Sequence, residues 1–325
     1  MDDDAKCGRS LSWSPSASSS VLQERARILH EIRDHFFQSG VMEVETPCWM
    51  RALAPEPNIE PVRSEDGYLM SSPETALKRL LSAGSGSIYR MGPVFRQDES
   101  GTLHNPEFTM VEWYRVGWDL SRLMEDVWAL VSRFIEVPMP RTLSYRQLFR
   151  ECVGCDPFTA PHAVLQKEAE QRDVGVENGT LVSWDREALW DLLWGFVVEP
   201  ELKKWSEPLF ITEFPASRAA MSTTCERDGV EVAQRTELYV RGIELANGYQ
   251  ELTDALEQQK RFELVNRHRV RDGRAALPVD ERFLAGLNTG MPDCAGVALG
   301  VDRLVMLALE LDDIRDVIAF PDTHV

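Results

Sequence analysis

The chain contains Phe95-Arg96-Gln97-Asp98-Glu99, followed after a short loop by His104-Asn105-Pro106-Glu107-Phe108-Thr109-Met110-Val111-Glu112-Trp113-Tyr114. In the second run, Phe108, Met110, Glu112 and Tyr114 occupy alternate positions. That spacing predicts a strand with all four side chains on one face. Glycine and proline between the runs predict a loop, so the segment is expected to form a hairpin.

The residue types in this hairpin suit a nucleotide site. The planar guanidinium of Arg96 matches phosphate oxygens, and the ring of Phe108 offers a surface on which a base can stack. Glu112 and Tyr114 would hold a cationic group further along the same face. The pattern also fits an ordinary amphipathic hairpin with a solvated acidic side, and a short motif alone does not separate the two.

A helix followed by a strand is predicted upstream of the hairpin. Apolar residues recur at helical spacing over residues 21–37, and Ser20 with Gln23 is placed for a capping box. Gly40 is expected to end the helix, and residues 41–47 read as a strand that Pro47 stops.

A glycine-rich turn lies downstream, in Gly296-Val297-Ala298-Leu299-Gly300-Val301-Asp302-Arg303, before the apolar helix 304–309. Small residues before a helix let a ligand approach the backbone, and Arg303 can lie against a purine while reaching phosphate. Alone, such a turn is weak evidence for a nucleotide site.

Taken together, the three segments resemble motifs 2, 1 and 3 of the class II aminoacyl-tRNA synthetases, and the run from His104 to Met110 is similar to the lysyl branch. The resemblance implies an α+β fold in which an antiparallel sheet of about six strands is flanked by helices. It also implies a homodimer, because motif 1 builds the dimer interface in that family.

The expected organisation follows from these segments. Residues 1–20 are polar and serine-rich and are predicted to be a flexible arm. Residues 21–325 are predicted to form a catalytic domain, with a mostly helical insertion over 120–205, strands over 210–254 and a helix over 255–274. Lysyl-tRNA synthetases carry an N-terminal oligonucleotide-binding barrel, for which there is no room here before motif 1.

The composition bears on location and partners. The 325 residues are 43% hydrophobic and 27% charged, with a formal net charge of −18. No apolar run is long enough to cross a membrane and no signal peptide is evident, so we expect a cytoplasmic protein. The acidic net charge argues against tRNA binding, because nucleic-acid-binding proteins usually present a basic face to the phosphates. The basic run 267–274 is interpreted as a solvated helix face.

The pattern of cysteines and the absence of a P-loop motif argue against other classes of protein. Six cysteines are scattered along the chain without a disulfide framework. Cys152 and Cys155, with His162 nearby, form at most half a zinc site and are interpreted as structural thiols. The chain contains no GxxxxGK[ST] motif, which argues against a P-loop kinase or ATPase.

Within the family, the resemblance is greatest to the lysyl-tRNA synthetase paralogues that modify translation elongation factor P. It is carried by residues 70–80, by residues 242–248 and by residues 290–300. Ala298 stands where lysyl-tRNA synthetases place glycine. The extra methyl group would reshape the amino-acid pocket to suit a substrate such as β-lysine.

The resemblance also implies roles for individual residues. Arg96 would hold the α-phosphate and the substrate carboxylate, and Phe108 and Arg303 would sandwich adenine, with Arg96, Glu244 and Arg303 as the catalytic set. Further ATP contacts would come from Gln97, Asp98, Glu99, His104, Asn105, Leu245 and Gly300. The amino acid would be bound by Ser72, Pro73, Glu74, Glu112, Tyr114, Glu251 and Ala298. Mg²⁺ would be held by Glu237 and Glu244.

Two details qualify these roles. The family has Arg-x-Glu in motif 2 where this chain has Asp98, so the adenine contact is expected from either Asp98 or Glu99. Glu237 and Glu244 are seven residues apart, which would put them on opposite faces of a flat strand. A bulge or bend is therefore expected at Gly242.

The sequence thus predicts an ATP- and Mg²⁺-dependent enzyme that forms an aminoacyl adenylate from lysine or (R)-β-lysine and transfers it to a lysine of elongation factor P. A minimal synthetase that charges tRNA and a non-catalytic amino-acid sensor are the alternatives. The retained ATP residues disfavour the sensor, whereas the missing barrel, Ala298 and the acidic charge disfavour the synthetase.

Overall fold

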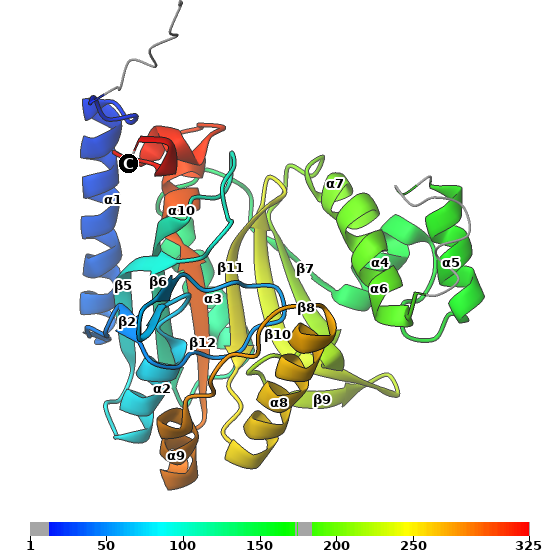
Figure 1. Ribbon diagram of the computed structural model, residues 1–325. Coiled ribbons are helices and arrows are strands. Elements are labelled where there is room, and N and C mark those ends of the chain that lie inside the picture. Colours follow the sequence, from blue (N-terminus) through cyan, green and yellow to red (C-terminus); the bar gives the residue numbers. More distant parts are fainter. Residues whose placement is uncertain (1–12, 173, 175–183, 325) are drawn as a thin grey trace, which may run out of the picture.

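A single large sheet organises the molecule. The computed structural model describes residues 13–172, 174 and 184–324. Within them, nine strands form a sheet in the order β1-β5-β6-β12-β11-β10-β8-β7, with β9 paired to β10 (Figure 1). In that order the strands are β1 (Met42–Glu43), β5 (Ile88–Phe95), β6 (Glu107–Val116), β12 (Cys294–Gly300), β11 (Ile243–Gln250), β10 (Val230–Val240), β8 (Leu209–Pro215) and β7 (Arg141–Ser144), with β9 at Thr224–Arg227.

The pairing of the strands matches the sequence prediction in the centre of the sheet. The six strands from β5 to β8 are antiparallel to their neighbours, as predicted. The edge strands β1 and β7 are instead parallel to β5 and β8, so the whole sheet is mixed. A small separate sheet is formed by β2 (Trp49–Met50), β4 (Gly67–Leu69) and β3 (Arg63–Ser64).

Helices cover both faces of the sheet (Figure 1). Their bounds are α1 (Ser19–Gln38), α2 (Glu74–Ser82), α3 (Leu120–Val131), α4 (Tyr145–Val153), α5 (His162–Gln171), α6 (Arg186–Leu193), α7 (Glu199–Leu202), α8 (Ala255–Arg271), α9 (Glu281–Gly290) and α10 (Val301–Ala308). The largest core joins α1, α3 and α10 to one face of the sheet. On the other face, α2, α8 and α9 pack against β5, β6 and β12.

Helix α1 confirms the helix predicted over residues 21–37, with a different cap. Ser18, not Ser20, is the N-cap, and its side chain accepts the hydrogen bond of the Val21 backbone. Helix α1 ends just before Gly40, whose φ of +68° is the left-handed conformation that glycine adopts most readily. The strand predicted over 41–47 is reduced to the two residues of β1.

The expectation of a flexible arm over residues 1–20 is wrong for its last residues. The backbone amides of Ser16 and Ala17 donate hydrogen bonds to the carbonyls of Ala319 and Ile318, and Ala17 is buried. Residues 1–12 lie outside the described part of the chain. The C-terminal segment therefore holds the start of α1 against the body of the protein.

The described residues of the segment 120–205 lie mainly in helices. Its first helix, α3, belongs to the main core, and β7 adds a strand to the sheet edge. Helices α4 to α7 build a second core against β8 and β10, on the right of Figure 1. At its centre the ring of Tyr145 stacks on Trp194 with a centroid separation of 4.5 Å.

The basic run on α8 is not entirely the solvated face that the sequence predicts. Arg269 is fully buried, and its guanidinium donates hydrogen bonds to the carbonyls of Glu56 and Ile59, both at 2.9 Å. It also forms an ion pair with Glu60 at 2.6 Å. Arg269 thus fastens the loop of residues 54–60 to α8.

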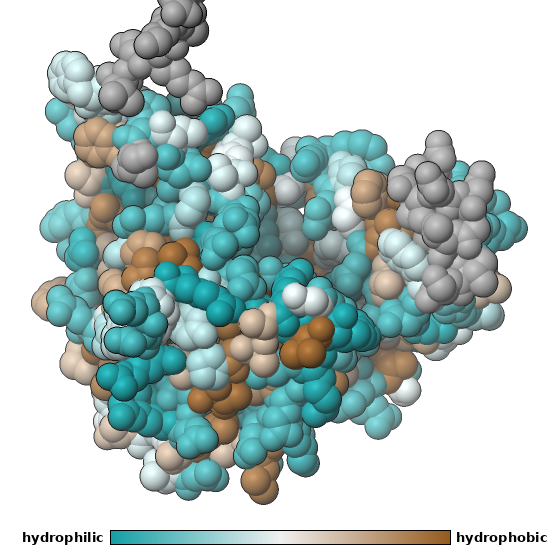
Figure 2. Space-filling view, in the orientation of Figure 1, coloured by the Kyte–Doolittle hydropathy of each residue, from teal (hydrophilic) through white to brown (hydrophobic). Residues whose placement is uncertain are grey.

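One face of the molecule is mainly polar. The face of the molecule in Figure 2 is largely hydrophilic, with apolar residues in scattered patches. Among the described residues, no helix combines the length and the apolar character needed to cross a membrane.

A buried carboxylate joins three elements of the main core. Asp126 on α3 accepts hydrogen bonds from Arg115 at 2.8 and 3.0 Å and from Trp113 at 3.1 Å, both on β6. His35 on α1 lies 3.3 Å from the same carboxylate. Burial would raise the pKa of Asp126, but the hydrogen bonds from His35 and Arg115 outweigh it and hold this pKa below its ordinary value.

We predict that Asp126→Ala lowers the free energy of unfolding by about 3 kcal/mol, because it leaves the buried Arg115 without its anion. The contribution is present above the pKa of an unfolded aspartate, about 4, and is lost as the pH falls through the lower folded-state value. Urea denaturation at several pH values measures it. The exposed neighbour Glu125→Ala is the control, and equal losses in the two variants would contradict the prediction.

Candidate active site

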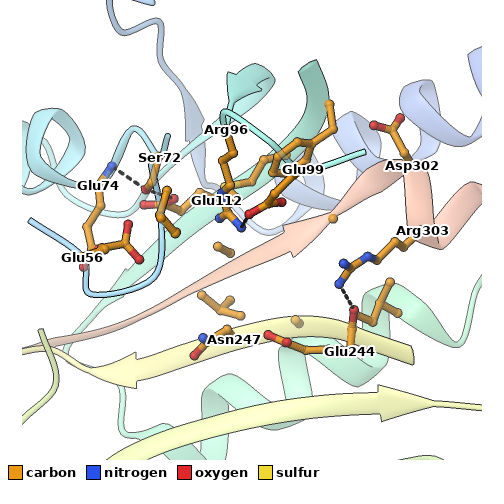
Figure 3. A pocket seen from close by; sticks show the side chains of 18 of the residues that line it. Glu56, Ser72, Glu74, Arg96, Glu99, Glu112, Glu244, Asn247, Asp302 and Arg303 are labelled. Atoms are coloured by element: carbon orange, nitrogen blue, oxygen red, sulfur yellow. Dashed lines mark hydrogen bonds and ion pairs between the residues drawn. The ribbon is translucent and has the colours of Figure 1, made fainter. Parts of the chain in front are cut away.

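A cavity of about 400 Å³ lies on the face of the sheet opposite α3. Its wall brings together residues from two separate stretches of the chain, 56–114 and 235–314, including β6, β10, β11, β12, the start of α2 and the loop of residues 54–60. Figure 3 shows Glu56 and Glu74 at one end, Glu244 and Arg303 at the other, and Arg96, Glu99 and Glu112 between them. We call these the Glu74 end and the Arg303 end.

Strand β6 places its side chains as the alternation predicts. Phe108, Met110, Glu112 and Tyr114 all line the cavity. The intervening Val111 and Trp113 are buried in the main core on the other face. Since the strand period is two, one strand supplies both a floor for the cavity and a layer of the core.

The Glu74 end is a cluster of buried carboxylates. Glu112 accepts hydrogen bonds from the hydroxyls of Ser72 at 2.9 Å and Tyr114 at 2.7 Å. Burial and the charge of Glu74 together raise the pKa of Glu112 to about 7, although the hydrogen bonds from Tyr114 and Ser72 act to lower it. Burial also raises the pKa of Glu251, against the attraction of a nearby ammonium.

That ammonium belongs to Lys78, which is fully buried on α2. Its Nζ lies 2.6 Å from Glu74 Oε1 and 2.6 Å from Glu251 Oε2. Burial would lower the pKa of Lys78, but the charges of Glu251 and Glu74 raise it above its ordinary value, so the side chain is a cation. The structure therefore gives Glu251 an internal partner, Lys78, in addition to the substrate ammonium that the resemblance implies for it.

Gly296 on β12 leaves room for this arrangement. A Cβ at this position would lie 2.4 Å from Glu251 Oε1 and 2.4 Å from a ring carbon of Tyr114. Both atoms belong to well-packed side chains, so any other residue would displace the carboxylate or the phenol. The glycine of the predicted motif thus shapes the Glu74 end.

The Arg303 end combines arginines with aromatic and carbonyl groups. Arg303 donates to the carbonyl of Glu244 at 2.8 Å and to the imidazole of His104 at 2.7 Å. Burial and the charge of Arg303 lower the pKa of His104, so the neutral ring accepts this bond. The guanidinium of Arg96 lies 5.1 Å from the centroid of the Phe108 ring and 3.7 Å from Glu99.

A bulge between β10 and β11 turns Glu244 toward the cavity. Leu238 pairs with Ala246 whereas Tyr239 pairs with Glu244, so Leu245 has no partner across the ladder. In a regular strand without this bulge, Glu244 would point to the same face as Ala246. The bulge or bend expected at Gly242 is present as a bend, because Gly242, with φ of +73°, lies in the hairpin turn. The bulge itself is at Leu245.

Glu244 and Glu237 differ in what surrounds them. Glu244 lines the cavity, and none of the described residues donates a hydrogen bond to its carboxylate. Burial and the charge of Glu237 raise the pKa of Glu244 to about 7. Glu237 does not line the cavity, because Arg235 and Tyr239 already bind its carboxylate. Only one of the two expected metal ligands is therefore open to the cavity.

Most of the other predicted residues are in the cavity wall, with three exceptions. Gln97 and Asp98 are exposed, and Asp98 occupies a turn with φ of +62°. Glu99 lines the cavity, which favours it over Asp98 for a ligand contact. Pro73 is the N-cap of α2 and does not line the cavity.

Several cavity residues were not predicted from the sequence: Glu56, Asn58, Ile59, Leu103, Arg235, Ala246, Asn247, Tyr249, Val297 and Ile314. Asn247 and Tyr249 share the alternation of β11 with Glu251, and that pattern was available in the sequence. Nothing in the sequence places the loop residue Glu56 there, because tertiary contacts of Arg269 hold its loop.

The cysteines remain thiols. The five described cysteines, Cys48, Cys152, Cys155, Cys225 and Cys294, form no disulfide, and Cys7 lies outside the described residues. Burial raises the pKa of both Cys152 and Cys155. Over residues 13–172, 174 and 184–324, no group of three or more His, Cys, Asp and Glu side chains is arranged to hold a metal ion.

Comparison with known proteins identifies the family. The model of the family "tRNA synthetases class II (D, K and N)" matches residues 7–324. The elongation factor P--(R)-beta-lysine ligase of Sodalis glossinidius is 46% identical, covering 96% of this chain and 98% of the relative. The proteins of the same name from Yersinia pestis (strain Pestoides F) and Yersinia pseudotuberculosis (serotype O:1b) are 45% identical, covering 95% and 97%. The chain belongs to the class II aminoacyl-tRNA synthetase family.

We predict that Lys78→Met lowers the free energy of unfolding by about 3 to 5 kcal/mol, because Glu74 and Glu251 are then buried without a cation. The double variant Lys78→Met, Glu251→Gln should recover part of this loss. Arg79→Met, at the exposed neighbouring position, is the control. Chemical denaturation of the four proteins makes the comparison, and a Lys78 variant as stable as the control would contradict it.

Proposed function

We propose that the protein activates lysine or (R)-β-lysine with ATP as an aminoacyl adenylate and transfers the aminoacyl group to the ε-amine of a lysine on elongation factor P. The observation that carries this proposal is the division of one cavity into an acidic end and an arginine-rich end on a single sheet face. The printed name of the curated relatives supports the choice of substrates.

The Glu74 end suits a substrate that carries two ammonium groups. Glu74 and Ser72 would bind the amine near the substrate carboxylate, and Glu112, Tyr114 and Glu251 would bind the distal ammonium. Ala298 borders the same space, where its methyl group limits the position of the substrate chain. Binding a cation there offsets the mutual repulsion of the buried carboxylates.

The Arg303 end suits ATP. Phe108 and Arg303 would hold adenine between ring and guanidinium, with His104, Asn105, Leu245 and Gly300 around the nucleotide and Glu99 rather than Asp98 as its acidic contact. Arg96 lies between the two ends, so it would bind the α-phosphate and the attacking carboxylate together. Adenylate formation depends on such positioning and charge neutralisation more than on a protein base.

Mg²⁺ is the expected metal, and the residues present fit it in part. The open carboxylate of Glu244, without a hydrogen-bond donor, offers the oxygen ligand that Mg²⁺ prefers. Glu237 would join it only by releasing Tyr239 or Arg235. When bound, the metal would neutralise phosphate charge during pyrophosphate release.

The homodimer expected from motif 1 has support on the surface. Phe37 is 84% exposed at the end of α1, and Met42 is 50% exposed on β1. We propose that a second copy of the chain covers these residues, as in closed twofold dimers.

The molecule that accepts the aminoacyl group distinguishes the proposed ligase from a tRNA-charging synthetase and from a non-catalytic sensor. The protein is incubated with ATP, Mg²⁺ and lysine or (R)-β-lysine, and the intact mass of elongation factor P and the charging of tRNA are read in parallel. We predict a mass gain on elongation factor P and no charged tRNA, because the net charge of −18 opposes nucleic-acid binding.

Variants of cavity residues test whether the reaction takes place in this cavity. Arg96→Ala should lower the rate by about 100-fold or more, the usual effect of removing a charge contact to the reacting groups. Arg133→Ala, an exposed arginine at the end of α3, is the matched control and should have no effect. Charged tRNA would identify a minimal synthetase instead, and neither product would favour a regulatory role.

A further inference from the structure

The loop of residues 54–60 brings one carboxylate into the cavity that the adenylation roles above do not use. The Glu56 side chain lines the cavity, and Figure 3 shows it next to Glu74. The neighbouring Pro57 and Asn58 are exposed, so this part of the wall is at the surface of the protein. A group that enters from outside along the loop would meet Glu56 before it reaches Glu112.

Within the described residues, the carboxylate of Glu56 forms no hydrogen bond or ion pair, in contrast to the other acids at the Glu74 end. Glu74 and Glu251 are paired with Lys78, and Glu112 accepts two hydrogen bonds. Glu99 pairs with Arg96 and Asp302 with Arg25. Among the described residues that line the cavity, only Glu56 and Glu244 have a carboxylate without a hydrogen bond or ion pair.

The loop holds Glu56 in a fixed place. The buried Arg269 binds the carbonyls of Glu56 and Ile59 and the carboxylate of Glu60. The backbone amide of Gln97, next to Arg96, donates to the carbonyl of Glu60 at 2.8 Å. The loop is therefore tied both to α8 and to the segment that carries Arg96, the residue proposed to hold the reacting carboxylate.

We propose that Glu56 is the general base of the transfer step, accepting the proton from the attacking lysine ε-amine of the acceptor protein. This inference rests on the proposed function. The neutral amine forms a bond to the carbonyl carbon of the adenylate, the bond from that carbon to the phosphate oxygen breaks, and AMP leaves with the electron pair. The proton lost by the nitrogen goes to the carboxylate of Glu56, so the products are the amide, AMP and the protonated acid.

The electrostatic environment of Glu56 is consistent with this role. Burial raises its pKa to about 7, Arg96 and Arg235 act to lower it, and Glu74 and Glu99 act to raise it. Tyr249 on β11 also faces it. A base whose pKa lies near the working pH is ionised and can still accept a proton, which is the favourable condition for general base catalysis.

The two half-reactions separate this role from substrate binding. Amino-acid-dependent exchange of pyrophosphate into ATP measures adenylation, and single-turnover mixing of preformed adenylate with elongation factor P measures transfer by intact mass. We expect Glu56→Gln to retain adenylation and to slow transfer by about 100-fold or more, and Glu56→Asp to recover part of the rate. Glu60→Gln, which weakens the ion pair to Arg269 that holds the loop, should slow transfer much less than Glu56→Gln, and the exposed Glu65→Gln should leave both half-reactions unchanged.

The pH dependence of transfer provides a second readout. In the wild type both Glu56 and the acceptor amine must be deprotonated, so the logarithm of the rate should rise with a slope of about two below pH ~7 and of about one above it. In Glu56→Gln the slope should be about one throughout, because only the amine titrates.

Four outcomes would overturn the inference. Equal loss of adenylation and transfer in Glu56→Gln would make Glu56 an anchor for the substrate amine. Unchanged transfer would exclude it as a base, and the same loss in Glu60→Gln would show that it acts by holding the loop. If the wild type forms adenylate but does not modify elongation factor P, the proposed function fails first, and the inference with it.

Discussion

The ion pairs of Lys78 with Glu74 and Glu251 are the interaction on which the cavity depends. They connect the start of α2 to the end of β11 across the sheet and place a cation among carboxylates that burial would otherwise drive to the protonated form. Gly296 supports the same arrangement by leaving the space that Glu251 and Tyr114 fill. The acidic end can therefore exist as a preformed site, which the proposed cationic substrate would enter without rearranging the core.

Two features of the backbone place the residues of the Arg303 end on the same sheet face as the Glu74 end. The extra residue Leu245 turns Glu244 to the cavity face, and the alternation of β6 puts Phe108 on the same face as Glu112. Adenine, phosphate and amino acid would then lie along one face, with Arg96 where the ends meet. This arrangement leaves carboxylates such as Glu112 and Glu244 with raised pKa values. Each of them therefore lowers the free energy of unfolding as the pH rises from about 4 to 7.

The parts of the site that could be predicted from the sequence are those governed by local periodicity or by a family motif. The face of β6 follows from a period of two, and the need for a bulge follows from the odd spacing of Glu237 and Glu244. The position of the bulge did not follow, because Gly242 is required in the turn, where a Cβ would lie 2.5 Å from the backbone of Lys203. The positions of Lys78 and Glu56 at the cavity were not predicted, since the burial of Lys78 and the anchoring of the Glu56 loop by Arg269 are tertiary properties.

The central claim is that one cavity joins ATP to an amino acid whose second ammonium group is recognised by buried carboxylates. Exchange of labelled pyrophosphate into ATP tests it most directly, with (R)-β-lysine, lysine and norleucine compared at equal concentrations. Norleucine is close in length to lysine and lacks the distal ammonium. We predict exchange with (R)-β-lysine or lysine and none above background with norleucine. Equal exchange with norleucine, or exchange without any amino acid, would contradict the account.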